Sequence, residues 1–149
     1  MATTVNIYLT FNGNCEEAFN FYKSAFGGEF SYVGKFGDMP PQEGMPAIPD
    51  NEKERIMHIA LPISKETMLM GSDASDAFGN ITTIGDNFSV SINTDSIDEA
   101  NRLFNALSEK GKINMPLSKT FWGAYFGMFT DRFGINWMVN VDLKESHIG

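Results

Sequence analysis

The sequence has little cysteine, little positive charge and no long apolar run. It contains one cysteine, Cys15, which excludes an internal disulfide and favours a reducing compartment. No apolar stretch approaches the roughly 20 residues that span a bilayer. The 11 lysines and arginines are scattered, and the net charge is −8. This charge argues against a nucleic-acid partner and suits neutral or cationic ligands better than anionic ones.

The amino terminus also lacks a basic segment followed by an apolar one, the pattern of a secretory signal. We therefore expect a cytoplasmic protein without a membrane partner. The composition, 42% hydrophobic and 20% charged, is typical of a globular protein. A length of 149 residues suits one domain with a substantial core.

Residues 5–28 follow a strand–helix pattern. Apolar residues alternate with Asn6, Tyr8 and Thr10, which predicts a strand. Asn14 and Glu17 form a capping-box pattern that predicts the start of a helix. A glycine pair at 27–28 predicts its end. The apolar stripe of this helix consists of Ala18, Phe21, Tyr22, Ala25 and Phe26.

The same order recurs about 80 residues later, in "NFSVSINTDSIDEANRLFNALSEKGK". Alternation from Asn87 predicts a strand, Ser96 and Glu99 form a second capping-box pattern, and Gly111 follows the helix. The apolar stripe of the second helix consists of Ala100, Leu103, Phe104 and Leu107. Three strand-like segments follow each helix. Each half is therefore predicted to be strand–helix–strand–strand–strand.

Two longer segments interrupt this pattern. Residues 37–54 contain four prolines and are predicted to be a long loop, and residues 74–86 join the halves. No linker is long enough to separate two independent domains. We expect a single domain over residues 1–149, made of modules at about 1–80 and 85–143 with a short tail.

The paired modules resemble the vicinal oxygen chelate superfamily, which includes glyoxalase I, extradiol dioxygenases and bleomycin-resistance proteins. The segments "YLTFNGNCEEAFNFYKSAFGGE", "MLMGSDA" and "TFWGAYFGMFTDRFGINWMVNV" are similar to its PhnB-like branch. The resemblance covers nearly the whole chain. It implies an α+β fold in which two βαβββ modules form a curved, cup-like mixed sheet.

In such a fold each helix covers one face of its sheet, and the other face lines the cup. Three sets of apolar residues are then expected beneath the helices: Ile7, Leu9 and Phe11; Phe88, Val90 and Ile92; and Trp137, Val139 and Val141. The alternating positions become candidate ligand contacts: Asn6, Tyr8, Thr10, Met70, Ser89, Ser91, Asn136 and Met138.

One histidine is a candidate catalytic residue. His58 shares a strand face with Ile56 and Ala60, and we place it in the cup. There it could act as a general acid or base, with Glu66 or Asp73 as an orienting carboxylate. The alternative is a partly buried strand histidine that simply has a hydrogen-bond partner.

The same resemblance shows which positions would have to hold the ligands of a metal site. Metal-dependent members carry His, Gln or Glu at the starts of the first strands and the ends of the last strands. These positions fall on Asn6, near Ser72, on Asn87 and on Met138, and none is a strong ligand. Asp73 is the only nearby carboxylate, and His147 lies in the tail. We predict no metal ligand and no cofactor, with a divalent metal kept as an alternative.

Two further features have two interpretations each. Cys15 lies where a helix dipole lowers a thiol pKa, but Glu16 and Glu17 oppose this, and we expect a passive residue. Trp122 and Tyr125 could form an aromatic wall for a flat or cationic ligand. They could equally be ordinary core residues.

The sequence therefore favours a protein that binds a small organic molecule in the cup without a conventional metal triad. The alternative from the resemblance is a metal-dependent lyase, isomerase or dioxygenase. A third possibility is an assembly module without a ligand. The resemblance also implies a homodimer, in which residues 37–54 either cover a cup or reach the partner.

Overall fold

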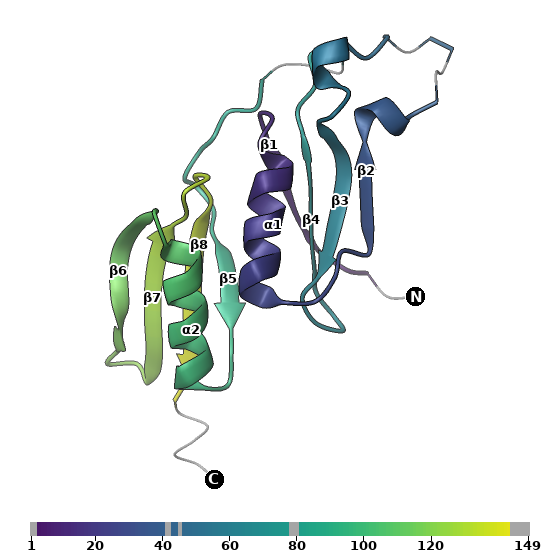
Figure 1. The fold of residues 1–149 in the computed structure, drawn as a ribbon. Coiled ribbons are helices and arrows are strands. Elements are labelled where there is room, and N and C mark those ends of the chain that lie inside the picture. Colours follow the sequence, from purple (N-terminus) through teal and green to yellow (C-terminus); the bar gives the residue numbers. More distant parts are fainter. Residues whose placement is uncertain (1–2, 41–42, 45, 78–80, 144–149) are drawn as a thin grey trace. The chain divides into compact units, whose positions relative to one another are not determined.

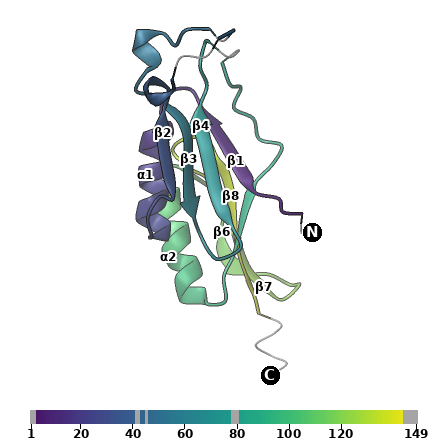
Figure 2. The same cartoon turned by 90° about the vertical axis from the view of Figure 1, so that its right-hand side faces the viewer.

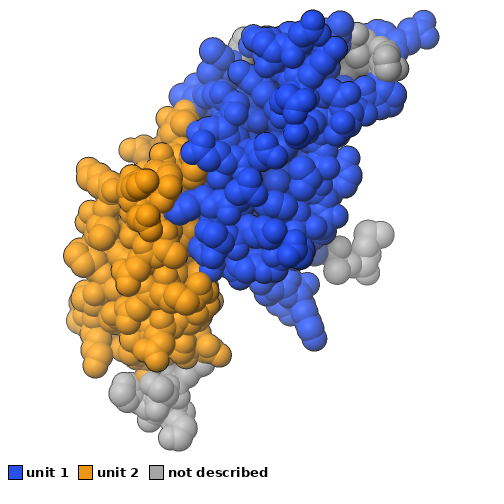
Figure 3. Space-filling model, in the orientation of Figure 1, with its two compact units in different colours: residues 1–83 blue, residues 84–149 orange. Residues whose placement is uncertain are grey.

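Each half of the chain folds as a strand, a helix and three further strands (Figure 1). The computed structural model describes residues 3–40, 43–44, 46–77 and 81–143. The chain divides into unit 1, residues 1–83, and unit 2, residues 84–149 (Figure 3). The α+β prediction of two βαβββ modules is confirmed. His147 and part of the joining segment lie outside the described residues.

Unit 1 has a four-stranded mixed sheet in the order β1-β4-β3-β2. Strand β1 runs parallel to β4, and the other pairs are antiparallel. The elements are β1 (Ile7–Phe11), α1 (Cys15–Phe26), β2 (Tyr32–Lys35), β3 (Ile56–Pro62) and β4 (Met68–Asp73). Two short 3₁₀ helices, η1 (Phe36–Asp38) and η2 (Asp50–Glu52), lie at the ends of the proline-rich loop.

Unit 2 repeats this topology in the order β5-β8-β7-β6. Strand β5 is parallel to β8, whereas β6, β7 and β8 are antiparallel. The elements are β5 (Val90–Asn93), α2 (Ile97–Ser108), β6 (Lys112–Lys119), β7 (Ala124–Thr130) and β8 (Asn136–Asp142). No helix in the described part of the chain has the length and apolar character needed to cross a membrane.

The start of α1 differs from the prediction. Asn14 occupies the cap position, but its side chain makes no capping hydrogen bond. Instead, Oδ1 of Asp73 accepts hydrogen bonds from the backbone N–H groups of Gly13 and Cys15, at 2.8 and 2.9 Å. Oδ2 accepts a third from Ile56 at 2.9 Å. The buried carboxylate at the end of β4 thus supplies the acceptor that the capping box was expected to provide.

The ends of the two helices show how local signals act. Gly27 has φ of +82° directly after α1, as the glycine pair predicts. The Ser96 side chain accepts a hydrogen bond from the N–H of Glu99, which confirms the cap of α2. After α2, however, Lys110 takes the left-handed conformation, with φ of 62°, and Gly111 does not. A side chain on Gly111 would instead collide with the carbonyl oxygen of Thr130.

Each helix covers one face of its own sheet. Figure 2 shows α1 along one face of the unit 1 sheet, where Leu9 and Phe11 are buried as expected. In unit 2, the predicted stripe of α2 is buried, as are Val90, Trp137, Val139 and Val141. Five expected core residues are not buried: Phe21, Phe26 and Ile92 are half-buried, Ile7 is 38% exposed and Phe88 is 55% exposed. Ile7 begins β1 and Phe88 precedes β5, so both side chains lie at strand ends that are not covered.

A register shift changes the faces of β3. Gly34 pairs with His58, but Lys35 pairs with Ile56, so β3 carries one extra residue at this point. The extra residue breaks the alternation that was expected to place Ile56 and His58 on one face. Ile56 is fully buried, whereas His58 is half-buried.

Candidate functional site

The face of the unit 1 sheet that α1 does not cover carries an aromatic cluster. A side chain on Gly71 would meet Phe19 of α1, so Gly71 faces the helix and its neighbour Met70 faces away. Tyr8 pairs with Met70 across β1 and β4, and Met70 pairs with Ala60 of β3. His58 lies two residues before Ala60, on this same face. The structure therefore brings together Tyr8, Met70 and His58.

His58 lies between two tyrosines. The Tyr8 hydroxyl is 3.3 Å from Nδ1 of His58, and the two rings are stacked with centroids 5.7 Å apart. The Tyr32 ring is 5.6 Å away on β2. Asp73 does not orient the imidazole, because its oxygens hold the three backbone N–H groups described above. The partner of His58 is thus a phenol, and a proton-transfer role for His58 stays a prediction.

The other sequence candidates of unit 1 lie along β1. Asn6 is exposed and precedes the strand, and Thr10 is half-buried and pairs with Ser72. Thr10 alternates with the buried Leu9 and Phe11, so it faces away from α1 as predicted.

In unit 2, several candidates share the face that α2 leaves uncovered. Ser91 pairs with Met138, and Met138 pairs with Met128. Trp122 lies in the turn before β7, 47% exposed, with its ring 6.2 Å from that of Phe126. A ligand role for Trp122 stays a prediction.

Tyr125 lies on the other face. Tyr125 pairs with the buried Val141, and its hydroxyl donates a hydrogen bond of 2.8 Å to Oδ1 of Asn101 on α2. Its hydroxyl therefore ties the sheet to the helix. This placement does not join Tyr125 to Trp122 in one wall, and it supports the structural interpretation of Tyr125.

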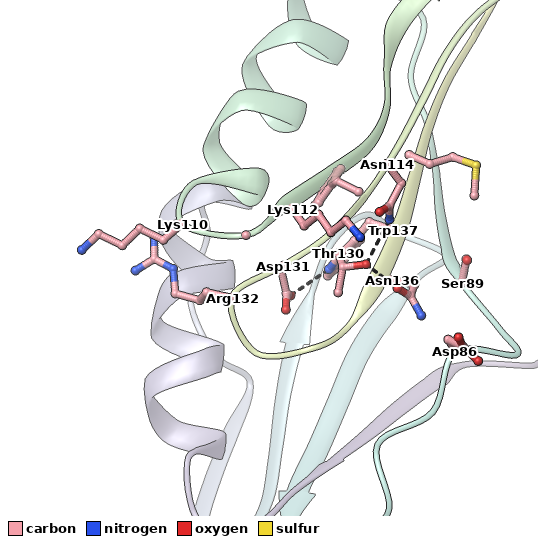
Figure 4. Close-up of a pocket in the computed structure, with 13 residues that line it drawn as sticks. Asp86, Ser89, Lys110, Lys112, Asn114, Thr130, Asp131, Arg132, Asn136 and Trp137 are labelled. Carbon is pink, nitrogen blue, oxygen red and sulfur yellow. Dashed lines mark hydrogen bonds between the residues drawn. The ribbon is translucent and has the colours of Figure 1, made fainter.

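A pocket of about 600 Å³ lies at the end of the unit 2 sheet, where β6 begins and β7 turns into β8 (Figure 4). Ser89 and Asn136, both candidate ligand contacts, line it. Because Val90 pairs with Trp137, Ser89 lies beside Asn136 on the neighbouring strand. The volume is within the range of small-molecule sites.

A chain of hydrogen bonds orders the polar side of the pocket. Nδ2 of Asn114 donates to the Thr130 hydroxyl at 3.0 Å, and this hydroxyl donates to Oδ1 of Asn136 at 2.7 Å. Figure 4 shows this relay directed toward Ser89 and Asp86. Sequence reasoning missed Asn114 and Thr130, because a bulge in β6 brings Asn114 to Thr130. The nearest signal was the alternation of Met128 and Thr130 with the buried Phe129.

Buried Asp131 lines the pocket and stabilises the turn beside it. Its Oδ1 accepts hydrogen bonds from the N–H groups of Phe133 and Ile135, at 2.8 and 3.0 Å, and its Oδ2 accepts one from the Trp137 indole at 2.9 Å. This carboxylate holds the turn between β7 and β8. Its role is therefore structural.

A third buried carboxylate, Glu52, was not predicted. Glu52, 1% exposed, accepts hydrogen bonds from the Ser75 hydroxyl at 2.6 Å and the N–H of Asp76 at 3.2 Å. Arg55 lies 3.4 Å from the same carboxylate. The hydrogen bond from Ser75 is the largest cause that lowers the pKa of Glu52 below its ordinary value. These contacts attach the end of the proline-rich loop to the segment after β4.

The position of the cysteine makes its thiol unreactive. Cys15 is fully buried at the start of α1. Burial raises the pKa of its thiol far above the ordinary value, and the charge of Asp73 adds to the effect. The helix dipole does not outweigh these causes, so the expectation of an unreactive thiol is supported.

The donors do not fit the metal site of the metal-dependent relatives. Ser72 is a half-buried hydroxyl on β4, Asn87 is exposed before β5, and Met138 contributes a thioether. Asp73, the one nearby carboxylate, is already bonded to backbone N–H groups. Within residues 3–40, 43–44, 46–77 and 81–143, no three His, Cys, Asp or Glu side chains form a group that could hold a metal ion.

Comparisons with known proteins agree with this architecture. A model of the Glyoxalase/Bleomycin resistance protein/Dioxygenase superfamily matches residues 4–139. Protein YjdN of Escherichia coli (strain K12) is 33% identical over 139 residues, which cover 90% of this chain and 92% of that protein.

Solved structures give the same result. Protein PA1353 from Pseudomonas aeruginosa is 45% identical with a TM-score of 0.82, over 95% of this chain and 98% of that chain. The PhnB protein from Bacillus cereus shares the fold, with 23% identity and a TM-score of 0.70 over 93% of this chain and 99% of that chain. With its two βαβββ modules and a family match over residues 4–139, the chain belongs to the glyoxalase/bleomycin resistance/dioxygenase superfamily.

Proposed function

We propose that this member of the superfamily binds a small organic molecule on the sheet faces that its helices leave uncovered, without a conventional metal triad. The observation that carries the proposal is the pocket of about 600 Å³ in unit 2. Ser89 and Asn136 line it, and both were ligand-contact candidates from the strand alternation alone. A pocket with a few oriented polar groups is typical of ligand sites.

The unit 1 sheet supports the same proposal. Tyr8 and Tyr32 flank His58 on the uncovered face, and both tyrosines are about half exposed. Such rings can stack on a flat or cationic group while their hydroxyls supply hydrogen bonds. The homodimer is a further proposal from the family resemblance.

The test compares two substitutions on β8. Flat, cationic, aromatic and amino-acid compounds are screened by thermal shift with the wild-type protein, N136L and N140L. Asn140 is the matched control, because it lies on the same strand face outside the pocket and has one side-chain hydrogen bond, to Asn93 at 3.2 Å. A ligand that binds only the folded state raises the melting temperature by mass action.

The expected result is a compound that stabilises the wild type and N140L but not N136L. Equal stabilisation of all three proteins would place the ligand outside the pocket and overturn this part of the proposal. Elemental analysis of protein purified without an affinity tag or chelator is the second measurement. Near-stoichiometric metal would overturn the metal-free proposal in favour of a metal-dependent enzyme.

A further inference from the structure

The amide of Asn136 has a defined orientation at the pocket. Its Oδ1 accepts the proton of the Thr130 hydroxyl, and this hydroxyl is itself held by Nδ2 of Asn114. Nδ2 of Asn136 is therefore turned toward the open side of the pocket, where Figure 4 shows it near Ser89 and Asp86. The relay thus presents N–H donors from Asn136 and leaves Oδ1 of Asn114 as an acceptor.

Only some of the charged residues around the pocket face it. Lys110 and Arg132 point away from the relay, whereas Lys112 extends toward Asn114 and Thr130 (Figure 4). Arg132 is also bonded to Glu109, with Nε 3.2 Å from its carbonyl oxygen. Asp131 is buried and bonded to the turn. This leaves Lys112 as the cation that faces the relay.

The opposite charge comes from Asp86. This exposed residue lines the other side of the pocket, beyond Asn136 and Ser89 (Figure 4). Neither Lys112 nor Asp86 has an ion-pair partner among the residues that the structure describes. Lys112 and Asp86 therefore place an unpaired charge of each sign beside the relay, with the oriented amides between them (Figure 4).

We infer that the ligand is a zwitterion of the amino-acid class, an inference that rests on the proposed function of this pocket. Lys112 would bind its carboxylate on one side of the pocket, and Asp86 would bind its ammonium group on the other (Figure 4). The amides of Asn114 and Asn136, which lie between these two charges, would supply further hydrogen bonds. The overall charge agrees: a protein of net charge −8 repels anions at long range, whereas a zwitterion carries no net charge. A ligand with only one charged group would leave the other protein charge unpaired.

The probes are the standard L-amino acids, titrated by calorimetry, followed by two analogues of the tightest binder. One analogue lacks the carboxylate and the other lacks the ammonium group. Each analogue should bind at least about tenfold more weakly than the parent, because each loses hydrogen bonds between charged groups. The variants K112Q and D86N should show a similar loss for the parent amino acid.

Matched controls separate direct contacts from the general field of the protein. K119Q removes the same charge from an exposed lysine at the other end of β6, outside the pocket, and D95N removes an exposed carboxylate outside it. Both should bind the amino acid like the wild type. Thermal unfolding checks that each variant is folded, and K112M replaces K112Q if that variant is not.

Three outcomes would overturn the inference. The first is equal weakening by K119Q and K112Q, which would indicate a field effect. The second is equal affinity for the amino acid and its singly charged analogues. The third is that no amino acid binds although another compound stabilises the protein in an Asn136-dependent way. This third outcome would leave the proposed function intact, whereas no Asn136-dependent ligand of any class would remove both.

Discussion

Oδ1 of Asp73 lies 2.9 Å from the backbone N of Cys15, 58 residues earlier in the chain, so a side chain on β4 caps α1. The same carboxylate accepts the N–H groups of Gly13 and Ile56. One side chain thus joins the turn after β1, the first turn of α1 and the start of β3. Its position explains how the helix is held on the sheet in unit 1.

Replacement of Asp73 should therefore be costly, whereas replacement of the residue at the cap position should not. D73A leaves three backbone N–H groups without their acceptor and should lower the free energy of unfolding by about 3 kcal/mol. N14A removes a side chain without a capping bond and should change it by less than about 0.5 kcal/mol.

Urea denaturation followed by circular dichroism measures both values, with D73N as a milder variant if D73A does not fold. A larger loss for N14A than for D73A would contradict the assignment of the cap.

The thiol of Cys15 should be unreactive in the folded protein. Its pKa is raised by burial, so the thiolate fraction at pH 8 is lower than for a free cysteine, and the atom is also inaccessible. Ellman's reagent should modify the protein at pH 8 only when denaturant is added. Rapid modification of the native protein would contradict a buried thiol.

The same shift predicts a dependence of stability on alkaline pH. The folded-state pKa of Cys15 lies above that of the unfolded chain, so the unfolded state loses the proton first. The stability of the wild type relative to C15A should therefore fall as the pH rises above about 8.5. A constant difference between pH 7 and pH 10 would contradict this expectation.

Glu52 should make stability depend on acidic pH. Its folded-state pKa is lowered, first by the hydrogen bond from Ser75, so the unfolded state binds the proton first. The stabilisation is present above the ordinary value of 4.5 and is lost as the pH falls through the lowered pKa. The free energy of unfolding, measured between pH 3 and pH 7, should change less with pH for E52Q than for the wild type.

S75A should also weaken the pH dependence of the free energy of unfolding, because it removes the main cause of the lowered pKa of Glu52. E66Q, which alters an exposed carboxylate, is the control and should keep the wild-type pH dependence. If E52Q and E66Q behave alike, Glu52 is not the group responsible.

Gly71 should tolerate no side chain. A Cβ there would lie 2.6 Å from the Leu9 carbonyl oxygen and 2.7 Å from the Phe19 ring, between β1 and α1. G71A should lower the free energy of unfolding by about 2 kcal/mol through overpacking. G85A is the control, because the nearest atom to its Cβ would be 3.9 Å away, and it should change stability little. Equal stability of the two variants in thermal unfolding would contradict the packing described here.

The sequence alone determined the features whose causes lie within one segment. The stripe of Ala100, Leu103, Phe104 and Leu107 predicted the buried face of α2, because helical spacing brings such residues together whatever packs against them. Ser96 predicted the start of α2, since its partner is three residues away. Strand alternation also singled out Ser89 and Asn136, and both line the pocket of unit 2, whereas their contact with a ligand stays a prediction.

Tertiary structure decided the features that depend on strand register and distant partners. The extra residue in β3 separated Ile56 from His58, and the bulge in β6 brought Asn114 to Thr130. Asp73 took the capping role of Asn14 because β4 ends beside the first turn of α1. Local patterns carry no information on which strand lies opposite or where a bulge falls. The ordered relay of the pocket, unlike its individual residues, was therefore visible only in the folded chain.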